Sequence, residues 1–453
     1  MFLSANFLTL DEKNGRLKAM KSAFRQHWGA MFLSLVALSF IAVQAFFSTH
    51  REKAVTELYF ADRMTEAHRV LIDEYNRLHQ GKVKVVPIDF PNPDFTTNER
   101  KEILARSLRG EGEGIDLFAV DVIWVQRFER WSEHLDPYFS RKELDGLSAE
   151  GLQTCYKDGK LVAIPFKLAQ GVLLYREDLL HALPGGKQMA EEVRRGITWT
   201  EFVKFGRNIR TPNPYYIFPA AEYEGLLCPF IEILLGREGT YFETYGFKFD
   251  TEPARKALRF LVDLVQTYKI TPEAATAMTE VSSYEYFIRR NGIFLRGWTT
   301  YDKDFSNVPE QKRFVRMAPL PHFEDGKPAS TFGGWNLMVS KFSTKKEEAI
   351  AFIKFLLGKE SQETIFTKGG YFPVVRTFYE EESYRKKFPE LAEISRLLAH
   401  GVHRPSHDKY TKYSEILAHY VFQAIRGRID VEDALRQATK AIESEKILLE
   451  PTL

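Results

Sequence analysis

The sequence predicts an α/β protein of two lobes joined by several strands and preceded by an apolar N-terminal helix. Three observations support this prediction. From residue 55 onward, short β-branched apolar runs alternate with amphipathic helical patterns, which is the order typical of an α/β fold. No linker, repeat or low-complexity tract interrupts that order, so we expect the chain to cross between the lobes as strands. A further apolar run occupies residues 28–47.

The composition fits a globular chain and argues against a nucleic-acid-binding protein. The chain has 453 residues, enough for two or three ordinary domains, and 44% of them are apolar. The 63 basic residues are balanced by 61 acidic ones, whereas a polyanion binder concentrates basic charge. Cys155 and Cys228 belong to no metal or disulfide motif. We therefore expect two buried, unpaired thiols, and neither a metal nor a cofactor.

Residues 1–54 are predicted to be a signal peptide or a membrane anchor. The apolar run 28–47 follows the basic residues Lys18, Lys21 and Arg25, which is the arrangement of an export signal. Its length is near the lower limit of the roughly 20 apolar residues that span a bilayer. We therefore expect the rest of the chain to be periplasmic or otherwise extracytoplasmic.

Two questions about this segment stay open. Small residues at 43–45 allow cleavage after Ala45, and the alternative is retention of the run as an anchor in the cytoplasmic membrane. Translation from Met20 instead of Met1 would give a leader of more ordinary length.

The body begins in the order strand, helix, strand, helix, strand. This order predicts parallel strands connected by crossover helices. In such sheets, ligands bind outside the carboxyl ends of the strands. Asp121 and Trp124 follow the third strand directly, so we expect both to reach a ligand. The five elements are expected near 54–63, 66–81, 83–90, 98–110 and 115–121.

The remainder of the body continues to mix strands and helices. A turn at Asp158-Gly159 leads into two apolar runs around Pro165, whose length and β-branched content favour strands. Thr198 with Glu201, and Thr344 with Glu347, have the spacing of helix capping boxes. Further helices are expected at 251–270, 413–429 and 431–449, and further strands at 291–298, 314–321 and 329–340.

Several of these stretches together resemble a known family. The chain is similar, over 55–445, to the extracellular solute-binding proteins of bacterial ABC importers, and within them to trehalose/maltose-type sugar binders. No single motif is diagnostic, and the resemblance depends on their number and order. The stretches are "IDLFAVDVIWVQRF", "DGKLVAIPFKLAQGVLLYREDLL", "YEGLLC", "NGIFLRGW", "APLP", "FGGWNLMVSK" and "GGYFPV".

The resemblance implies a type II-like periplasmic-binding-protein fold, with two α/β lobes that close on a ligand around a multi-strand hinge. We expect 55–165 with 298–340 in the N-terminal lobe, and 166–297 with 341–453 in the C-terminal lobe, each built on a mainly parallel sheet. The resemblance further implies a monomer that hands a carbohydrate, a disaccharide or oligosaccharide, to the permease subunits of an ABC importer.

The candidate ligand residues suit a sugar. The apolar faces of a sugar pack on aromatic rings, and its hydroxyls form strong hydrogen bonds with charged side chains. By their chemistry, aromatic faces come from Trp298, Tyr301 and Trp335, and polar groups from Asp121, Glu224 and Arg404. The resemblance implies sugar contacts for Asp121, Glu224, Trp298, Trp335 and Arg404. Trp124, Tyr223 and Gly334 complete the candidate set.

Within this set, Trp335 is predicted to be a stacking platform, with Gly333 and Gly334 letting the ligand approach. Each candidate also has a purely structural alternative. Trp335 could be core, Asp121 a helix cap, Glu224 a surface turn residue, Arg404 an ion-pair partner, and Trp124 a brace at the strand end.

One departure from the family pattern concerns specificity. Many relatives carry a Thr-Asp pair whose carboxylate contacts the sugar, whereas Leu168 and Ala169 stand at the corresponding places here. A site that loses one hydrogen-bonding group prefers a different hydroxyl pattern, so the identity of the sugar is not implied.

The sequence leaves two alternative functions. The sequence has no hydrolase, metalloprotease, P-loop or dinucleotide motif, and only the pair Asp121 and Glu224 could serve glycoside hydrolysis. We therefore expect no enzymatic activity. A membrane-anchored sugar-sensing receptor is the other alternative, motivated by the segment 28–47.

Overall fold

The computed structural model describes residues 55–90, 97–110, 114–300, 305 and 307–445, together with scattered residues between 14 and 40. By its internal contacts the chain forms two units, Met1–Thr56 and Glu57–Leu453, and the second unit is called the body below.

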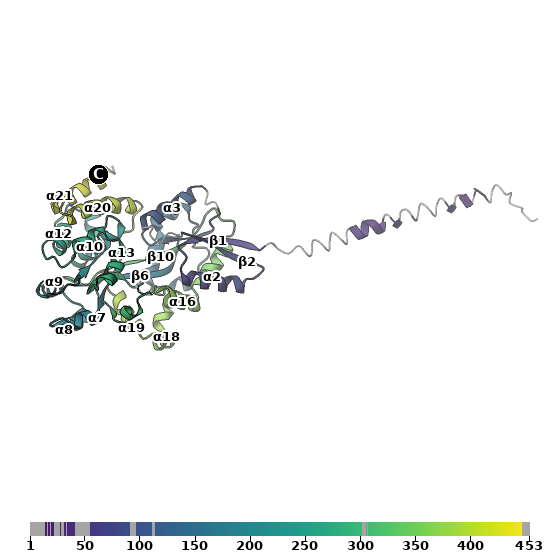
Figure 1. Cartoon of the computed structure of the whole chain (residues 1–453). Helices are drawn as coiled ribbons and strands as arrows, with labels where there is room; N and C mark the ends of the chain where they lie inside the picture. The colour runs from purple at the N-terminus through teal and green to yellow at the C-terminus, as the bar shows by residue number, and fades with distance from the viewer. Residues whose placement is uncertain are drawn as a thin grey trace, which may run out of the picture. The chain divides into compact units, whose positions relative to one another are not determined.

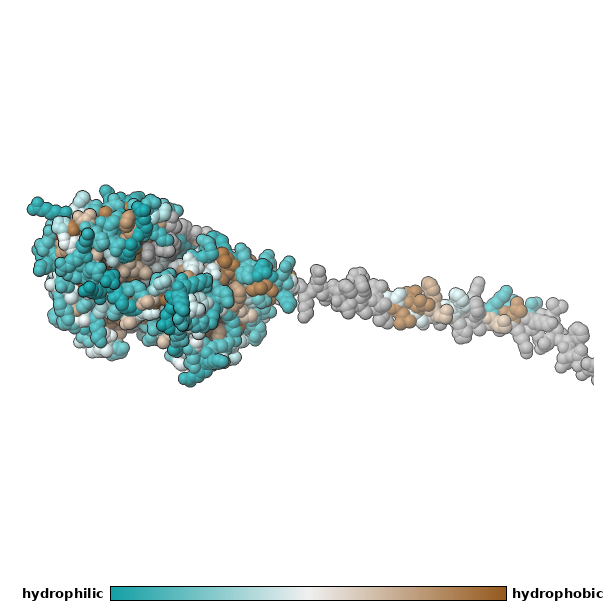
Figure 2. Space-filling view, turned by 90° about the horizontal axis from the view of Figure 1, so that it is seen from below, coloured by the Kyte–Doolittle hydropathy of each residue, from teal (hydrophilic) through white to brown (hydrophobic). Residues whose placement is uncertain are grey.

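In the first unit, the described residues between 14 and 40 are helical, and large apolar side chains such as Phe32 and Phe40 are exposed (Figure 2). Half of the predicted segment 28–47, including the cleavage position Ala45, lies outside the described residues. None of the helices in the described ranges is both long and apolar enough to cross a membrane.

The body is organised around one hydrogen-bonded sheet. Its main strand order is β2-β1-β3-β10-β6-β8-β7, with β9 also paired to β6 and β11 to β10, while β4 and β5 form a separate hairpin. The strands are β1 (Thr56–Asp62), β2 (Val83–Asp89), β3 (Leu117–Asp121), β4 (Tyr156–Lys157), β5 (Lys160–Leu161), β6 (Ile164–Arg176), β7 (Tyr216–Ile217), β8 (Phe294–Trp298), β9 (Val315–Ala318), β10 (Ser330–Val339) and β11 (Gly401–Val402).

Helices surround this sheet at both ends. Figure 1 shows α2 and α3 with β1 and β2 at one end of the body, and α9, α12, α20 and α21 at the other. The helices of eight or more residues are α2 (Glu66–Leu78), α3 (Thr97–Arg109), α8 (Gly186–Arg195), α9 (Trp199–Asn208), α10 (Glu224–Arg237), α12 (Glu252–Gln266), α13 (Glu280–Arg289), α15 (Lys346–Leu356), α16 (Lys359–Gly369), α19 (Leu391–Leu398), α20 (Tyr410–Ile425) and α21 (Val431–Ser444). Shorter helical turns are α4 (Val125–Phe128), α5 (Arg141–Asp145), α6 (Ala149–Leu152), α7 (Glu177–His181), α11 (Tyr241–Tyr245), α14 (Pro309–Lys312), α17 (Thr377–Glu380), α18 (Glu382–Lys387), η1 (Glu129–Trp131), η2 (Gln153–Cys155) and η3 (Glu273–Ala277).

The body contains two large hydrophobic cores. The first is formed by β1, β3, α2, α3 and the start of β6, together with the end of β10 and α15. The second is formed by α9, α10, α12, α20 and α21 packed on the end of β6 and on β8. Each core draws on several separate segments of the chain. Helix α15 packs on the first core, and β9 pairs with residues 173–176 of β6 beside the second.

The prediction of a mainly parallel sheet in each lobe is wrong. β1 runs parallel to β3, and β7 to β8, but the two long strands β6 and β10 are antiparallel to each other and to most of their neighbours. Hydrogen bonding also continues from one core to the other. Residues 164–170 of β6 pair with β10, and residues 171–175 pair with β8. The chain therefore crosses near residue 170 within one uninterrupted strand, and the expected lobe boundaries stay a prediction.

Local sequence signals explain several element ends. Asp158 and Gly159 both adopt positive φ, as a tight hairpin turn requires, and they join β4 to β5. The Thr198 hydroxyl accepts a hydrogen bond from the Glu201 amide, so Thr198 is the N-cap of α9 as expected. The Glu201 carboxylate accepts from the Thr198 hydroxyl, and the two residues form one half of a capping box rather than the reciprocal pair. The predicted box at Thr344 is wrong, because Lys345 occupies the N-cap position of α15 and makes no side-chain cap.

Candidate functional site

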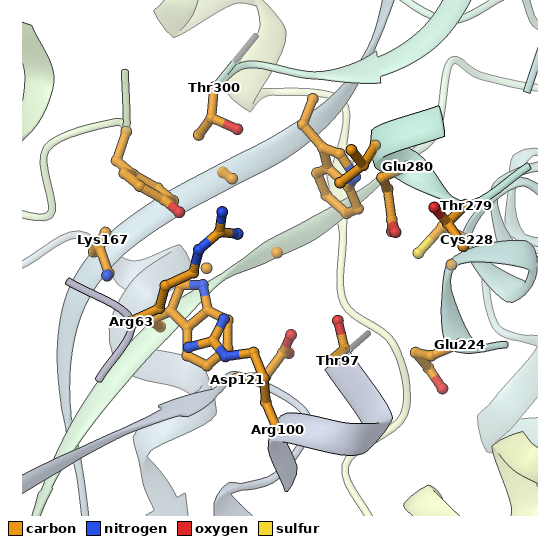
Figure 3. A pocket seen from close by; sticks show the side chains of 18 of the residues that line it. Arg63, Thr97, Arg100, Asp121, Lys167, Glu224, Cys228, Thr279, Glu280 and Thr300 are labelled. Carbon is orange, nitrogen blue, oxygen red and sulfur yellow. The ribbon is translucent and has the colours of Figure 1, made fainter. Parts of the chain in front are cut away.

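A cavity of about 550 Å³ lies at the carboxyl ends of β1 and β3, beside the middle of β6 and β10 (Figure 3). This is the edge at which α/β sheets bind ligands. The lining residues are Asp62, Arg63, Met64, Thr65, Thr97, Arg100, Asp121, Lys167, Ala169, Glu224, Gly225, Cys228, Thr279, Glu280, Val281, Ser282, Tyr284, Glu285, Trp298, Thr300, Gly333, Gly334, Trp335, Tyr371 and Arg404.

Trp335 is half-buried in this cavity. Its strand β10 places it opposite Asp121 on β3 and Lys167 on β6. The ring meets Trp124 edge to face, with the centroids 5.4 Å apart. The guanidinium carbon of Arg100 lies 3.9 Å from the Trp335 centroid, a distance typical of a cation–π contact. Trp335 therefore presents an aromatic surface to the cavity, and an arginine covers part of it.

The two glycines before Trp335 line the cavity and also allow close packing, so ligand approach over them stays a prediction. A Cβ on Gly333 would lie 2.8 Å from the Trp298 ring. Gly334 has φ +131°, and a Cβ there would lie 2.2 Å from the carbonyl oxygen of Lys167. Gly333 thus leaves room for Trp298, and Gly334 lets β10 lie close against β6.

Trp298 ends β8 and lines the same cavity. The guanidinium of Arg296 lies over its ring, with a carbon-to-centroid distance of 4.3 Å. Arg296 is itself buried and forms a bidentate ion pair with Glu232, with Nη2 2.6 Å from Oε1. Trp298 is therefore held in place by a buried, paired charge.

Asp121, Glu224 and Arg404 form a buried charged triad in the cavity wall. Arg404 donates from Nη1 to Glu224 Oε1 at 2.9 Å, and from Nη2 to Asp121 Oδ1 at 3.4 Å. The Tyr410 hydroxyl also donates to Glu224 at 2.9 Å. Burial raises the pKa of the Asp121 carboxyl, while Arg404 opposes that rise. The sequence predicted these three residues, and the structure brings them together from β3, α10 and the segment before α20.

Glu224 is not a surface turn residue. It is buried in the first turn of α10, where the helix dipole favours a negative charge. The Asp121 carboxylate lines the cavity and accepts a hydrogen bond from the Ile123 amide at 3.2 Å. It does not cap the next helix, because the N-cap residue of α4 is Trp124.

Two predicted residues lie outside the cavity lining. Trp124 is buried in the first core, stacked on Phe128 with centroids 6.0 Å apart, so it braces the strand end as its structural alternative proposed. Tyr223 is buried beneath the start of α10. The prediction that both line the ligand site is wrong for this cavity, because the Trp124 ring packs in the first core and Tyr223 is the buried N-cap residue of α10. Tyr301 lies outside the described residues.

Sequence patterns did not predict a second charged cluster, which lies in the cavity wall away from Glu224. Asp62, the last residue of β1, accepts from Lys167 Nζ at 2.8 Å and from Arg100 Nη2 at 3.0 Å. His68 Nε2 lies 2.9 Å from the same carboxylate. A signal for Asp62 was present, because Asp62 ends β1 as Asp121 ends the neighbouring parallel strand. Lys167 and Arg100 follow no such pattern.

The cysteines behave as expected. Cys155 and Cys228 are buried free thiols, and burial raises the pKa of Cys228 to about 11. Among the described residues, no group of three or more His, Cys, Asp and Glu side chains has the arrangement of a metal site.

A second cavity, of about 600 Å³, shares Arg404 with the first and is lined also by His403. His403 Nε2 is buried without a hydrogen-bond partner in the described structure. Burial, and then the charge of Arg404, lower the pKa of His403 to about 4. The unfolded chain therefore takes up a proton near pH 6.5 that the folded protein accepts only near pH 4.

This difference predicts a pH-dependent stability. The contribution of His403 is fully present above about pH 6.5 and is lost as the pH falls toward 4, by roughly 1–3 kcal/mol given its partial exposure. Urea unfolding at several pH values should show a wild-type loss that His403→Gln reduces. The exposed His181→Gln is the control. Parallel pH profiles for the wild type and His403→Gln would contradict the expectation.

Comparisons with known proteins agree with this architecture. The chain is 26% identical over 333 residues to a probable ABC transporter-binding protein of Deinococcus radiodurans, covering 71% of this chain and 76% of the relative. A maltose-bound T. maritima MalE3 structure matches with a TM-score of 0.76 and 25% identity, covering 86% of this chain and 100% of that chain.

A cyclic alpha-maltosyl-1,6-maltose binding protein from Arthrobacter globiformis matches with a TM-score of 0.70 and 21% identity, over 86% of this chain and 99% of that one, and shows likeness of fold. The sequence profile described as bacterial extracellular solute-binding protein matches residues 61–363, from the end of β1 through the cavity-forming strands and into α16. With more than half of its length matched, the chain belongs to the bacterial extracellular solute-binding protein family.

Proposed function

We propose that this protein captures a carbohydrate in the cavity beside Trp335 and delivers it to the permease of an ABC importer. The observation that carries the proposal is the cavity itself. It joins two half-buried tryptophans, Trp298 and Trp335, to a ring of charged side chains. Aromatic faces with charged hydrogen-bonding groups around them suit the C–H faces and hydroxyls of a sugar. The T. maritima protein, which is described as maltose-bound, supports the same class of ligand.

The geometry suggests how a sugar ring would be received. Arg100 covers part of Trp335, and Arg296 lies against Trp298. A sugar ring therefore either stacks on the part of Trp335 that Arg100 leaves exposed or displaces Arg100. After such a displacement, Asp62 would still be paired with Lys167. Glu224 and Asp121 keep their carboxylates oriented through Arg404, so they are preorganised to accept hydrogen bonds from hydroxyls.

The position of the missing family carboxylate lies in this cavity. Ala169 lies on β6 two residues after Lys167, and both residues line the cavity. A methyl group there offers no hydrogen bond, so we propose that the hydroxyl pattern preferred by this site differs from that of trehalose and maltose binders. The same proposal includes two further points. Residues 28–47 act as a signal peptide or a membrane anchor, and the rest of the protein lies outside the cytoplasm.

Replacement of Trp335 by Ala tests the proposal. Removal of the ring is expected to weaken saccharide binding by at least roughly 1 kcal/mol, or about fivefold. Titration calorimetry with a panel of neutral and acidic disaccharides and oligosaccharides measures this loss. Trp199→Ala in the second core is the matched control, because it should lower stability by about 3–5 kcal/mol while leaving affinity unchanged. Equal affinity in Trp335→Ala and the wild type would refute the stacking role.

A further inference from the structure

The charges in the cavity are unevenly divided between its two sides. Figure 3 shows Arg63, Arg100 and Lys167 on one side of the view, and Glu224 and Glu280 on the other. On the second side, Glu224 pairs with Arg404, which also contacts Asp121, drawn in Figure 3 between the two sides and beside Arg100. Glu280, in the first turn of α13, has no ion-pair partner among the described residues. That side therefore carries excess negative charge.

The opposite side carries excess positive charge. Asp62 is the carboxylate there, and it contacts both Lys167 Nζ at 2.8 Å and Arg100 Nη2 at 3.0 Å. His68 adds no further positive charge, because burial lowers its pKa and favours the neutral imidazole. One carboxylate thus faces two cations even before Arg63 is counted.

Arg63 adds a third cation without a partner. Its side chain lines the cavity and makes no ion pair or hydrogen bond in the part of the chain that the structure describes. The hydrogen-bonding capacity of Arg100 is also not fully satisfied, because its Nε is buried and lacks a hydrogen-bond partner in the described structure. Buried donors without acceptors are costly, and a guanidinium matches the two oxygens of a carboxylate or phosphate in a bidentate pair. The two arginines together offer such donors to one anionic group.

We propose that the saccharide carries an anionic substituent, a carboxylate or a phosphate, which binds Arg63 and Arg100 while its hydroxyls donate to the acidic side. This inference rests on the proposed function, because it names the class of carbohydrate. The anion is received next to Trp335, on whose ring Arg100 lies. A sugar ring on Trp335 therefore places a substituent within reach of both guanidinium groups.

Titration calorimetry of the full chain tests the inference with matched probes. Maltose and trehalose serve as neutral probes, digalacturonate as the carboxylate probe, and trehalose 6-phosphate as the phosphate probe. We expect one of the anionic probes to bind at least tenfold more tightly than either neutral probe. Arg63→Ala should reduce that binding at least tenfold, and neutral binding less than twofold. The anionic probe with the higher affinity identifies the group as a carboxylate or a phosphate.

The control is Arg69→Ala, which removes the same charge from the exposed face of α2 and should change neither affinity. Neutral probes that bind as tightly as both anionic probes would overturn the inference and leave the proposed function standing. An anionic probe whose affinity is unchanged by Arg63→Ala would also overturn it. If none of the four probes binds while a neutral saccharide of the wider panel does, the inference is overturned and the proposed function stands. If no saccharide of the panel binds, the proposed function fails, and the inference fails with it.

Discussion

Replacing Arg404 by Met is expected to lower the free energy of unfolding by about 3–5 kcal/mol. The Arg404 side chain is 3% exposed, and it is the shared partner of Asp121 and Glu224. Methionine retains much of the apolar stem but leaves two carboxylates buried without their cation. Burial already raises the pKa of Asp121, and loss of the opposing Arg404 charge should raise it further. Urea unfolding at pH 7 measures the loss of stability.

The matched control for Arg404 is Arg289→Met. Arg289 pairs with Glu285 one helical turn away, and both side chains are exposed. Such surface pairs contribute little, so the control should change stability by less than about 0.5 kcal/mol. Arg404→Met with the stability of this control would show that the triad is solvated rather than buried, and the description of the cavity wall would be wrong.

Replacing Gly334 by Ala should have a comparably large effect. Its φ of +131° is a conformation that a side chain disfavours, and the new Cβ would lie 2.2 Å from the Lys167 carbonyl oxygen. The conformational strain alone costs about 1–3 kcal/mol. The overlap with the backbone of β6 adds to it, because Gly334 lies in the stretch where β10 pairs with residues 164–170 of β6. We expect a total loss above about 3 kcal/mol, measured by thermal or urea unfolding.

Gly159→Ala separates the strain from the overlap. Gly159 has φ +77° in the β4–β5 turn, and nothing lies within 4 Å of its added Cβ. This change should cost only about 1–2 kcal/mol. Equal losses at the two glycines would mean that Gly334 is required for its backbone angle alone, and that close packing of β10 on β6 plays no part.

Much of the fold followed from sequence patterns because those patterns are local. The strand β8 and the helix α12 appeared within the expected ranges 291–298 and 251–270. The sheet pairing did not follow, since it is set by long-range contacts. Nothing local in residues 164–176 indicates that one strand would pair with β10 at one end and with β8 at the other.

The site was predictable where strand ends and family motifs coincide. Asp121 lies at a strand end, and Arg404 matched the family pattern, and both line the cavity. Trp124 lies three residues after Asp121, but its side chain is buried in the first core, where it packs on Phe128. Arg63 and Arg100 were missed because their position depends on how α3 and the end of β1 meet, which no spacing along the chain reveals.

The most direct test of the account is a structure of the protein with the saccharide that it binds most tightly. The account predicts one saccharide in the 550 Å³ cavity, with a sugar ring in van der Waals contact with Trp335 and hydroxyls within hydrogen-bond distance of Asp121 or Glu224. A saccharide that leaves this cavity empty and lies instead in the second cavity, beside His403, would contradict the account.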